Sequence, residues 1–194
     1  MSRPIRALIL AMLVASCGSS DFSAPRNLDD ACSIVSQRPQ YLRAMQRAER
    51  TWGAPVPVLM AMIHQESRFV GNARTPFRWR LGVIPVGRQS SAYGYSQALD
   101  GTWDEYVAER GGRRARRDDI EDATDFMGWY MAKSRDELSI PMGDARRQYL
   151  AYHEGRSGYR RGSYNAKSWL LDVSARVATR AATYENQLTA CGRR

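Results

Sequence analysis

A glutamate on the apolar side of a predicted helix is the residue in this sequence best placed for acid–base chemistry. Residues 55–69 predict a helix, because two prolines suit its first turn and apolar residues recur along it. With a turn of about 100° per residue, several apolar side chains lie within about 60° of Glu66. These are Leu59, Met62, Ile63 and Phe69. The Glu66 carboxyl group is therefore expected to face the core.

Burial gives such a carboxyl group a chemical use. Loss of water disfavours the charged form, so burial raises the pKa of a glutamate toward neutrality, where the group can act as a general acid. A simpler interpretation is a glutamate at the edge of the apolar stripe that pairs with an arginine. Helix geometry alone favours this simpler interpretation.

Two short clusters farther along the chain combine glycine with hydrogen-bonding side chains. Residues 92–98 read AYGYSQA, where Gly94 lets the backbone approach a ligand and Gln97 offers both a donor and an acceptor. Residues 149–155 read YLAYHEG, where Tyr152 precedes a glycine that ends a helix. Each cluster alone is a weak indication, since a tyrosine at a helix end is more often there for packing.

Taken in order, the three segments resemble the lytic transglycosylase domain of the lysozyme-like superfamily. That family carries a Glu-Ser pair at a helix end, matched by residues 66–67, and then Gly-x-x-Gln, matched by residues 94–97. Its Ala-Tyr-Asn-x-Gly motif is matched in part by residues 151–155, where His153 stands in the place of asparagine. Tyr-Ser also replaces the usual apolar-Met pair inside the second motif. The resemblance covers residues 55–177.

The resemblance implies a mainly α, lysozyme-like α+β fold in which a small loop or hairpin lines a glycan cleft. It also implies cleavage of the β-1,4 bond between N-acetylmuramic acid and N-acetylglucosamine in peptidoglycan. Glu66 would act first as acid and then as base, giving 1,6-anhydro ends without water, cofactor or metal. The residues implied to bind substrate are Ser67, Tyr95, Gln97 and Tyr152.

Three other functions stay open at this stage. A hydrolytic muramidase would need a second carboxylate to activate water, and Asp100 lies near Gln97 in the sequence. An inactive lipoprotein that binds glycan as part of an envelope machine would also fit the altered third motif. A binder of nucleic acid would fit the arginine content but not an exported chain.

The elements expected to position these residues make one mostly helical domain. Residues 70–93 hold scattered glycine and proline and predict a long loop or small β-hairpin. Thr102 and Glu105 have the spacing of a capping box. The predicted helices span residues 40–52, 55–69, a short segment from 102, 119–133, 141–152 and 168–188.

The N-terminus predicts export and lipid attachment. Arg3 and Arg6 precede an apolar run, Ala7–Val14, that is too short to span a bilayer but suits a signal peptide. Small residues followed by Cys17 resemble a bacterial lipobox, and the glycine after the cysteine favours the outer membrane. An ordinary signal peptide with an incidental cysteine is the alternative. We expect a signal peptide over 1–16, a lipidated tether over 17–31 and the catalytic domain over 32–194.

Charge and the remaining cysteines agree with a periplasmic location. Of 194 residues, 29 are Lys or Arg and 20 are Asp or Glu, giving a net charge of +9 that suits an anionic partner. With Cys17 taken by lipid, Cys32 and Cys191 are candidates for a disulfide in an oxidising compartment, and two free thiols are the alternative. We expect a monomer that binds peptidoglycan strands, contacts the membrane through its lipid and binds no nucleic acid.

Overall fold

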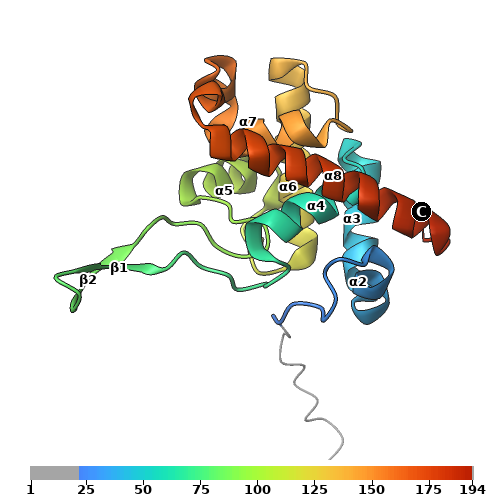
Figure 1. Ribbon diagram of the computed structural model, residues 1–194, viewed down its shortest axis with the longest axis horizontal. Helices are drawn as coiled ribbons and strands as arrows, with labels where there is room; N and C mark the ends of the chain where they lie inside the picture. The colour runs from blue at the N-terminus through green and yellow to red at the C-terminus, as the bar shows by residue number, and fades with distance from the viewer. Residues whose placement is uncertain (1–21, 194) are drawn as a thin grey trace, which may run out of the picture.

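The computed structural model describes residues 22–193, which form a helical body with one β-hairpin (Figure 1). Two strands, β1 (Phe77–Arg80) and β2 (Ile84–Arg88), pair in antiparallel fashion. The longer helices are α3 (Pro39–Trp52), α4 (Val56–Ser67), α6 (Ile120–Leu138), α7 (Ala145–Arg160) and α8 (Ser168–Ala190). The shorter ones are α2 (Ala31–Gln37), α5 (Asp100–Tyr106), the π-helical η2 (Val107–Gly111) and the 3-10 helix η3 (Ser163–Ala166). The predicted mainly helical fold and the presence of a hairpin are confirmed, but no residue of β1 or β2 lines the cleft that Gln97 and Tyr152 share, so the expected cleft-lining role of the hairpin is not observed.

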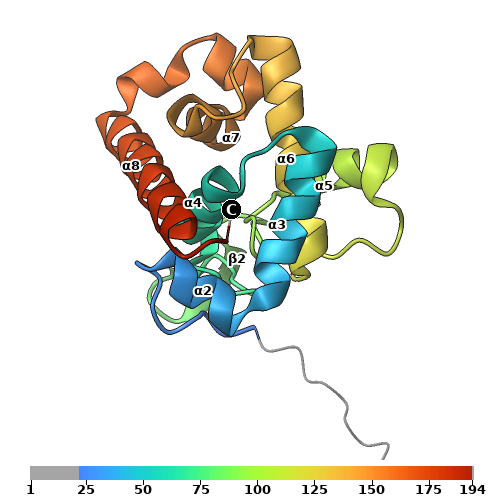
Figure 2. The ribbon, with the colours of Figure 1, turned by 90° about the vertical axis from the view of Figure 1, so that its right-hand side faces the viewer.

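Helix α4 lies at the centre of the helical body. Its residues from Val58 to Ile63 are all buried, and a helix that is apolar on every side belongs in a core. Helices α3, α6, α7 and α8 all contact it, and Figure 2 shows them arranged around it. The C-terminal end of α4, which carries Glu66, is thereby fixed by packing from several directions.

Helix α7 is longer than the sequence predicted and is bent. The backbone of Gly155 has φ 73° and ψ 154°, which interrupts the helix before it resumes as far as Arg160. The sequence predicted a helix that ends near residue 152, followed by a glycine-rich turn. The helix resumes because residues beyond the bend have partners on neighbouring helices.

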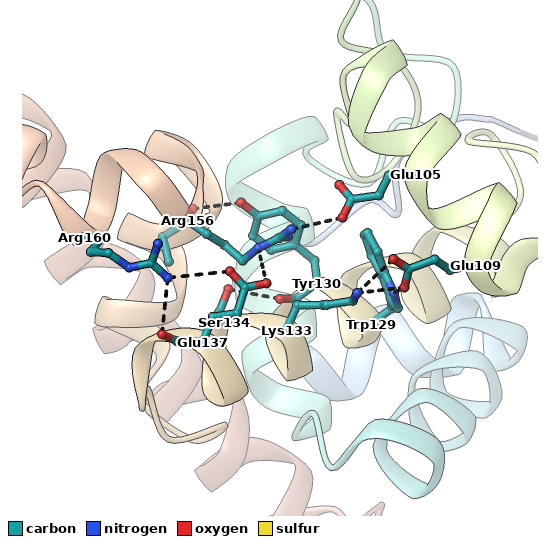
Figure 3. A network of polar contacts seen from close by, with 10 residues as sticks. Glu105, Glu109, Trp129, Tyr130, Lys133, Ser134, Glu137, Arg156 and Arg160 are labelled. Carbon is teal, nitrogen blue, oxygen red and sulfur yellow. Dashed lines mark hydrogen bonds and ion pairs between the residues drawn. The ribbon is translucent and has the colours of Figure 1, made fainter.

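Arg156, the first residue after the bend, is held by charged and aromatic partners from two helices (Figure 3). It pairs with Glu105 on α5 at 3.0 Å and with Glu137 on α6 at 2.9 Å. Its guanidinium group also lies 5.2 Å from the centre of the Tyr130 ring. This cluster fixes the chain on the far side of the Gly155 bend.

The predicted capping box at Thr102 is wrong. Helix α5 begins at Asp100, with Leu99 in the N-cap position and no side-chain cap. Glu105 is engaged by Arg156 instead of reaching back along its own helix. An interhelical ion pair has thus replaced the local contact that the spacing suggested.

Residues 22–30, expected to form part of a tether, lie against the helical domain. The carbonyl oxygen of Phe22 accepts a hydrogen bond from the Gly71 amide at 2.9 Å, and that of Leu28 accepts one from the Tyr184 hydroxyl at 2.5 Å. Cys17 and the signal peptide over 1–16 lie outside the described residues, so the division of the chain stays a prediction. No helix between residues 22 and 193 is long and apolar enough to cross a membrane.

The structure contains the predicted disulfide between Cys32 and Cys191, whose Cα atoms are 6.4 Å apart. Cys32 belongs to α2, and Cys191 follows the last residue of α8. The bond joins two segments separated by 159 residues in sequence, and the Ala31 amide donates to Gln187 beside it at 2.8 Å. It therefore ties the start of the domain to its last helix.

Replacing both cysteines by serine is expected to lower the free energy of unfolding by about 2–5 kcal/mol, because the unfolded chain regains the entropy that the long loop had lost. Urea unfolding of the wild type and of the Cys32→Ser/Cys191→Ser variant measures the difference. The wild type in reducing agent is the control and should unfold like the variant. Equal unfolding midpoints in oxidising buffer would show that the bond contributes nothing.

Candidate active site

The Glu66 carboxyl group lies at the end of α4 and faces two tyrosines of α7. Its side chain is partly buried, and the loss of water raises its pKa from 4.5 to about 7. A hydrogen bond from the Tyr149 hydroxyl group opposes this rise, because it favours the ionised carboxylate. The apolar position predicted for Glu66 is thus observed, and the partner is tyrosine rather than the arginine of the simpler interpretation.

The backbone turns sharply immediately after Glu66 and Ser67. Arg68 and Phe69 both adopt left-handed conformations, with φ of 51° and 61°, which cost non-glycine residues about 1 kcal/mol each. Phe69 is fully buried and its ring stacks on Tyr41 with centres 5.8 Å apart. Burial of this ring offsets the strain and holds the end of α4 in place.

Tyr149 and Tyr152 stand three residues apart on α7, so their side chains share one face of the helix. Burial raises the pKa of both hydroxyl groups, and the charge of ionised Glu66 raises it further, so both tyrosines stay neutral. The Tyr152 hydroxyl donates to the carbonyl oxygen of Ser96 at 2.6 Å. Tyr152 therefore connects α7, Glu66 and the turn that holds Gln97.

The turn of residues 94–97 is fixed by contacts within the protein. Gly94 has φ 80°, and a Cβ atom there would lie 2.0 Å from the carbonyl oxygen of Arg117. The close approach that requires this glycine is therefore to the protein's own backbone, not to a ligand as predicted. Gln97 also has positive φ, and its Nε2 donates to the carbonyl oxygens of Ala73 at 3.0 Å and Gly94 at 2.8 Å.

A cleft of about 210 Å³ lies beside these residues. Gln97 lines one part of it, and Tyr152 with the residues up to the Gly155 bend lines another. The remaining lining residues come from the start of α5 and from α6. The full lining is Gln97, Ala98, Leu99, Thr102, Phe126, Tyr130, Tyr152, His153, Glu154 and Gly155.

The predicted site residues thus fall into two groups. Gln97 and Tyr152 line the cleft. Glu66 is not among the lining residues, but its carboxyl group interacts with Tyr152, which is one of them, and with Tyr149. Ser67 is buried, and its hydroxyl donates to the Ile63 carbonyl at 3.3 Å within α4. Tyr95 lies in the core, where its hydroxyl meets that of Tyr41 at 3.1 Å. The structure does not place Ser67 or Tyr95 among the cleft residues.

Tyr149 belongs to the site, although the sequence analysis assigned it no role. Its hydroxyl group is the one that hydrogen-bonds to the Glu66 side chain. The available signal was its spacing of three residues from Tyr152, which places both on one helix face. Which partner that face meets depends on how α7 packs on α4, and the spacing does not reveal it.

A carboxylate other than that of Glu66, the carboxylate of Glu154, lines the cleft, but both of its oxygens have partners. One oxygen pairs with Lys167 at 2.7 Å and with His153 at 3.2 Å, and the other accepts from Ser163. These partners outweigh the effect of burial and lower its pKa to about 2. Asp100, the acid considered from sequence, pairs with Arg117 at 2.7 Å and lines a different, arginine-rich cleft.

The geometry therefore provides one carboxyl group that can change its protonation state near neutral pH. Glu66 has a donor, Tyr149, that stabilises its ionised form and a mostly buried setting that stabilises its protonated form. Such a group can give a proton and take one back within a single reaction. Within residues 22–193, no group of three or more His, Cys, Asp or Glu side chains gathers as a metal site would require.

A family model described as a transglycosylase SLT domain matches residues 5–191, which is nearly the whole chain. No curated protein matches the sequence. The matched region contains α4, which carries Glu66, and every residue that lines the cleft.

Glu66→Gln is expected to stabilise the protein above pH 7 relative to the wild type. Because folding raises the Glu66 pKa from 4.5 to about 7, wild-type stability falls as pH rises through this range. The glutamine carries no such proton, so the difference in unfolding free energy should shift in its favour by at most about 3 kcal/mol. Urea unfolding at several pH values measures this shift, and the difference at low pH is the internal control. A difference that does not vary with pH would contradict the raised pKa.

Proposed function

We propose that this chain, which belongs to the transglycosylase SLT domain family, cleaves the β-1,4 bond between N-acetylmuramic acid and N-acetylglucosamine with Glu66 as its catalytic residue. Membership of the family supports the broader statement, a peptidoglycan-acting function of the lytic transglycosylase type in the periplasm. The observation that supports cleavage by Glu66 is the raised pKa of its carboxyl group. Its pKa of about 7 makes both protonation states accessible at neutral pH.

In the first step, protonated Glu66 gives its proton to the glycosidic oxygen, and the bond from that oxygen to the muramyl C1 breaks. Positive charge develops at C1, and the acetamido oxygen of the same sugar stabilises it, as in other substrate-assisted glycosidases. In the second step, the Glu66 carboxylate takes the proton of the C6 hydroxyl group, and that oxygen bonds to C1. The product is a 1,6-anhydro sugar, Glu66 is protonated again, and no water is consumed.

The two tyrosines of α7 support these steps in different ways. Tyr149 hydrogen-bonds to Glu66 and stabilises the carboxylate that exists between the two proton transfers. Tyr152 donates to the Ser96 carbonyl, so it holds the Gln97 turn against the cleft rather than moving a proton itself. Both are positioning residues in this proposal.

The hydrolytic alternative receives less support. An inverting or water-activating mechanism needs a second carboxylate that is free to accept a proton. The oxygens of Glu154 are committed to Lys167, Ser163 and His153, and Asp100 is paired with Arg117. With Glu154 and Asp100 held by these partners, Glu66 is left to make both proton transfers, which favours the anhydro product.

We also propose that the protein works as a lipid-anchored monomer on the periplasmic side of the outer membrane. The basis is the sequence of the N-terminus, in which Cys17 would carry the lipid after loss of residues 1–16. Mass spectrometry of the protein purified from membranes, with and without Cys17→Ser, tests the attachment.

Digestion of purified peptidoglycan sacculi tests the reaction. The wild type is expected to release muropeptides with anhydro-muramyl ends, one water lighter than the reducing ends of a hydrolase. Glu66→Gln should lower the release about 10³-fold, since it has no proton to transfer, while sedimentation with sacculi persists. Glu121→Gln, at an exposed glutamate that pairs with Arg47, is the matched control and should remain active.

Two results of the digestion would reject the proposal. Reducing ends from the wild type would identify a muramidase. Folded wild type that sediments with sacculi and releases nothing would identify a glycan-binding protein without catalysis.

Tyr149→Phe is expected to move the alkaline limit of activity to higher pH. Activity falls as Glu66 loses the proton that it must donate, and loss of the Tyr149 donor raises the Glu66 pKa further, by about half a unit to one unit. The pH profile of kcat measures the move. Tyr159→Phe, in the same helix but stacked on Tyr164, should leave the profile unchanged. A lower rate with an unmoved profile would show that Tyr149 does not act through Glu66.

A further inference from the structure

The β1–β2 hairpin stands away from the helical body (Figure 1). It exposes large apolar side chains. Exposure is greatest at its tip, where Leu81 is 85% exposed and Val83 is 74% exposed. The other exposed apolar residues of the two strands are Phe77, Trp79, Ile84 and Val86. Contiguous apolar surface of this kind on a protein usually marks a contact with another body.

The backbone conformation of Leu81 is energetically unfavourable for a leucine at the tip of the hairpin. Leu81 and Gly82 both have positive φ, 53° and 74°, and the Val83 amide donates to the Arg80 carbonyl across the turn at 3.3 Å. Such turns favour Asn, Asp or Gly at the first of these positions, and a leucine there costs about 1 kcal/mol. Phe69 offsets a similar strain by burying its ring, but Leu81 buries little of its side chain against the rest of residues 22–193. A contact that buries Leu81 would offset this cost.

Apolar side chains occupy both faces of the hairpin. Trp79 pairs with Pro85 and Arg80 pairs with Ile84, and residues that pair across strands share a face. Neighbours along a strand point to opposite faces, so Trp79 lies on one face and Ile84 on the other. A flat protein surface would cover only one of them. The interfacial region of a bilayer surrounds an inserted hairpin and covers both.

The charged side chains of the hairpin and of the segments that flank it are all positive. The segment from 70 to 99 contains no aspartate or glutamate. Its arginines are Arg74, Arg78, Arg80 and Arg88. Arginines beside exposed tryptophan and leucine suit a membrane surface, where the cations meet anionic headgroups and the apolar groups enter the acyl boundary.

We propose that the β1–β2 hairpin inserts its tip, from Trp79 to Ile84, into the surface of an anionic lipid bilayer. The exposed tip, the strained turn and the uniform charge support this contact independently of the proposed lipid at Cys17 and of the proposed reaction. The hairpin would thus be a second, non-covalent membrane contact of this domain.

Sedimentation with lipid vesicles tests the proposal. The chain from residue 18 onward is used, because it lacks Cys17 and the apolar run before it yet retains every described residue. Vesicles of phosphatidylglycerol with phosphatidylethanolamine are compared with vesicles of phosphatidylcholine alone. The wild type is expected to bind the anionic vesicles more strongly, and added salt should weaken this binding.

Two pairs of variants separate the apolar from the electrostatic contribution. Leu81→Asn/Val83→Thr removes the apolar tip while asparagine suits the turn, and should lower binding to anionic vesicles about 10- to 100-fold. Arg78→Gln/Arg80→Gln should lower it about 10-fold or more. The matched controls are Trp169→Gln, an exposed apolar residue elsewhere, and Arg113→Gln/Arg114→Gln, and both should bind like the wild type. Thermal unfolding by circular dichroism verifies that each variant is folded.

Three outcomes would overturn the proposal. The first is wild type that does not sediment with anionic vesicles. The second is equal binding by wild type and Leu81→Asn/Val83→Thr. The third is a tip that is needed for binding sacculi, or for self-association in sedimentation velocity, while vesicle binding is absent.

Discussion

The contact between the end of α4 and the tyrosine face of α7 is the interaction on which the site depends. Placing a carboxyl group among apolar side chains is unfavourable, and the fold tolerates it because Glu66 can stay protonated and because Tyr149 meets its ionised form. That contact exists only if α4 runs through the core and ends where α7 begins its bend. The surrounding helices and the buried Phe69 turn hold α4 in this position.

The bend at Gly155 divides α7 into two parts with different tasks. Before the bend, Tyr149 and Tyr152 face Glu66 and the Gln97 turn. After it, Arg156 is paired with acids of α5 and α6. Glu154, next to the bend, is paired with Lys167 just before α8. The cleft walls therefore come from elements that are bonded to one another on both sides of the bend.

Sequence patterns predicted what depends on local chemistry and missed what depends on which surfaces meet. The apolar stripe of α4 placed Glu66 in the core, glycine and proline placed the hairpin, and cysteine positions with an export signal predicted the disulfide. The packing of Gly94 on Arg117 and the burial of Tyr95 against Tyr41 involve residues remote in sequence. No spacing rule reports such contacts. The capping box failed for the same reason, because Arg156 arrives from another helix.

Hydrogen bonds at Ala73 connect the hairpin to the cleft. The Ala73 carbonyl oxygen accepts from the Gly94 amide at 2.9 Å and from Gln97 at 3.0 Å, so the segment that leads out to β1 is bonded to the turn that carries Gln97. Thr75 and Ser90 bond to each other across the base of the hairpin. If the tip docks on lipid as proposed, these bonds set the height and the orientation of the cleft above the membrane. A covalent lipid alone would leave both to the length of the chain between Cys17 and the domain. The hairpin would then determine which layer of the cell wall reaches the cleft, and Glu66 would catalyse the cleavage of that layer.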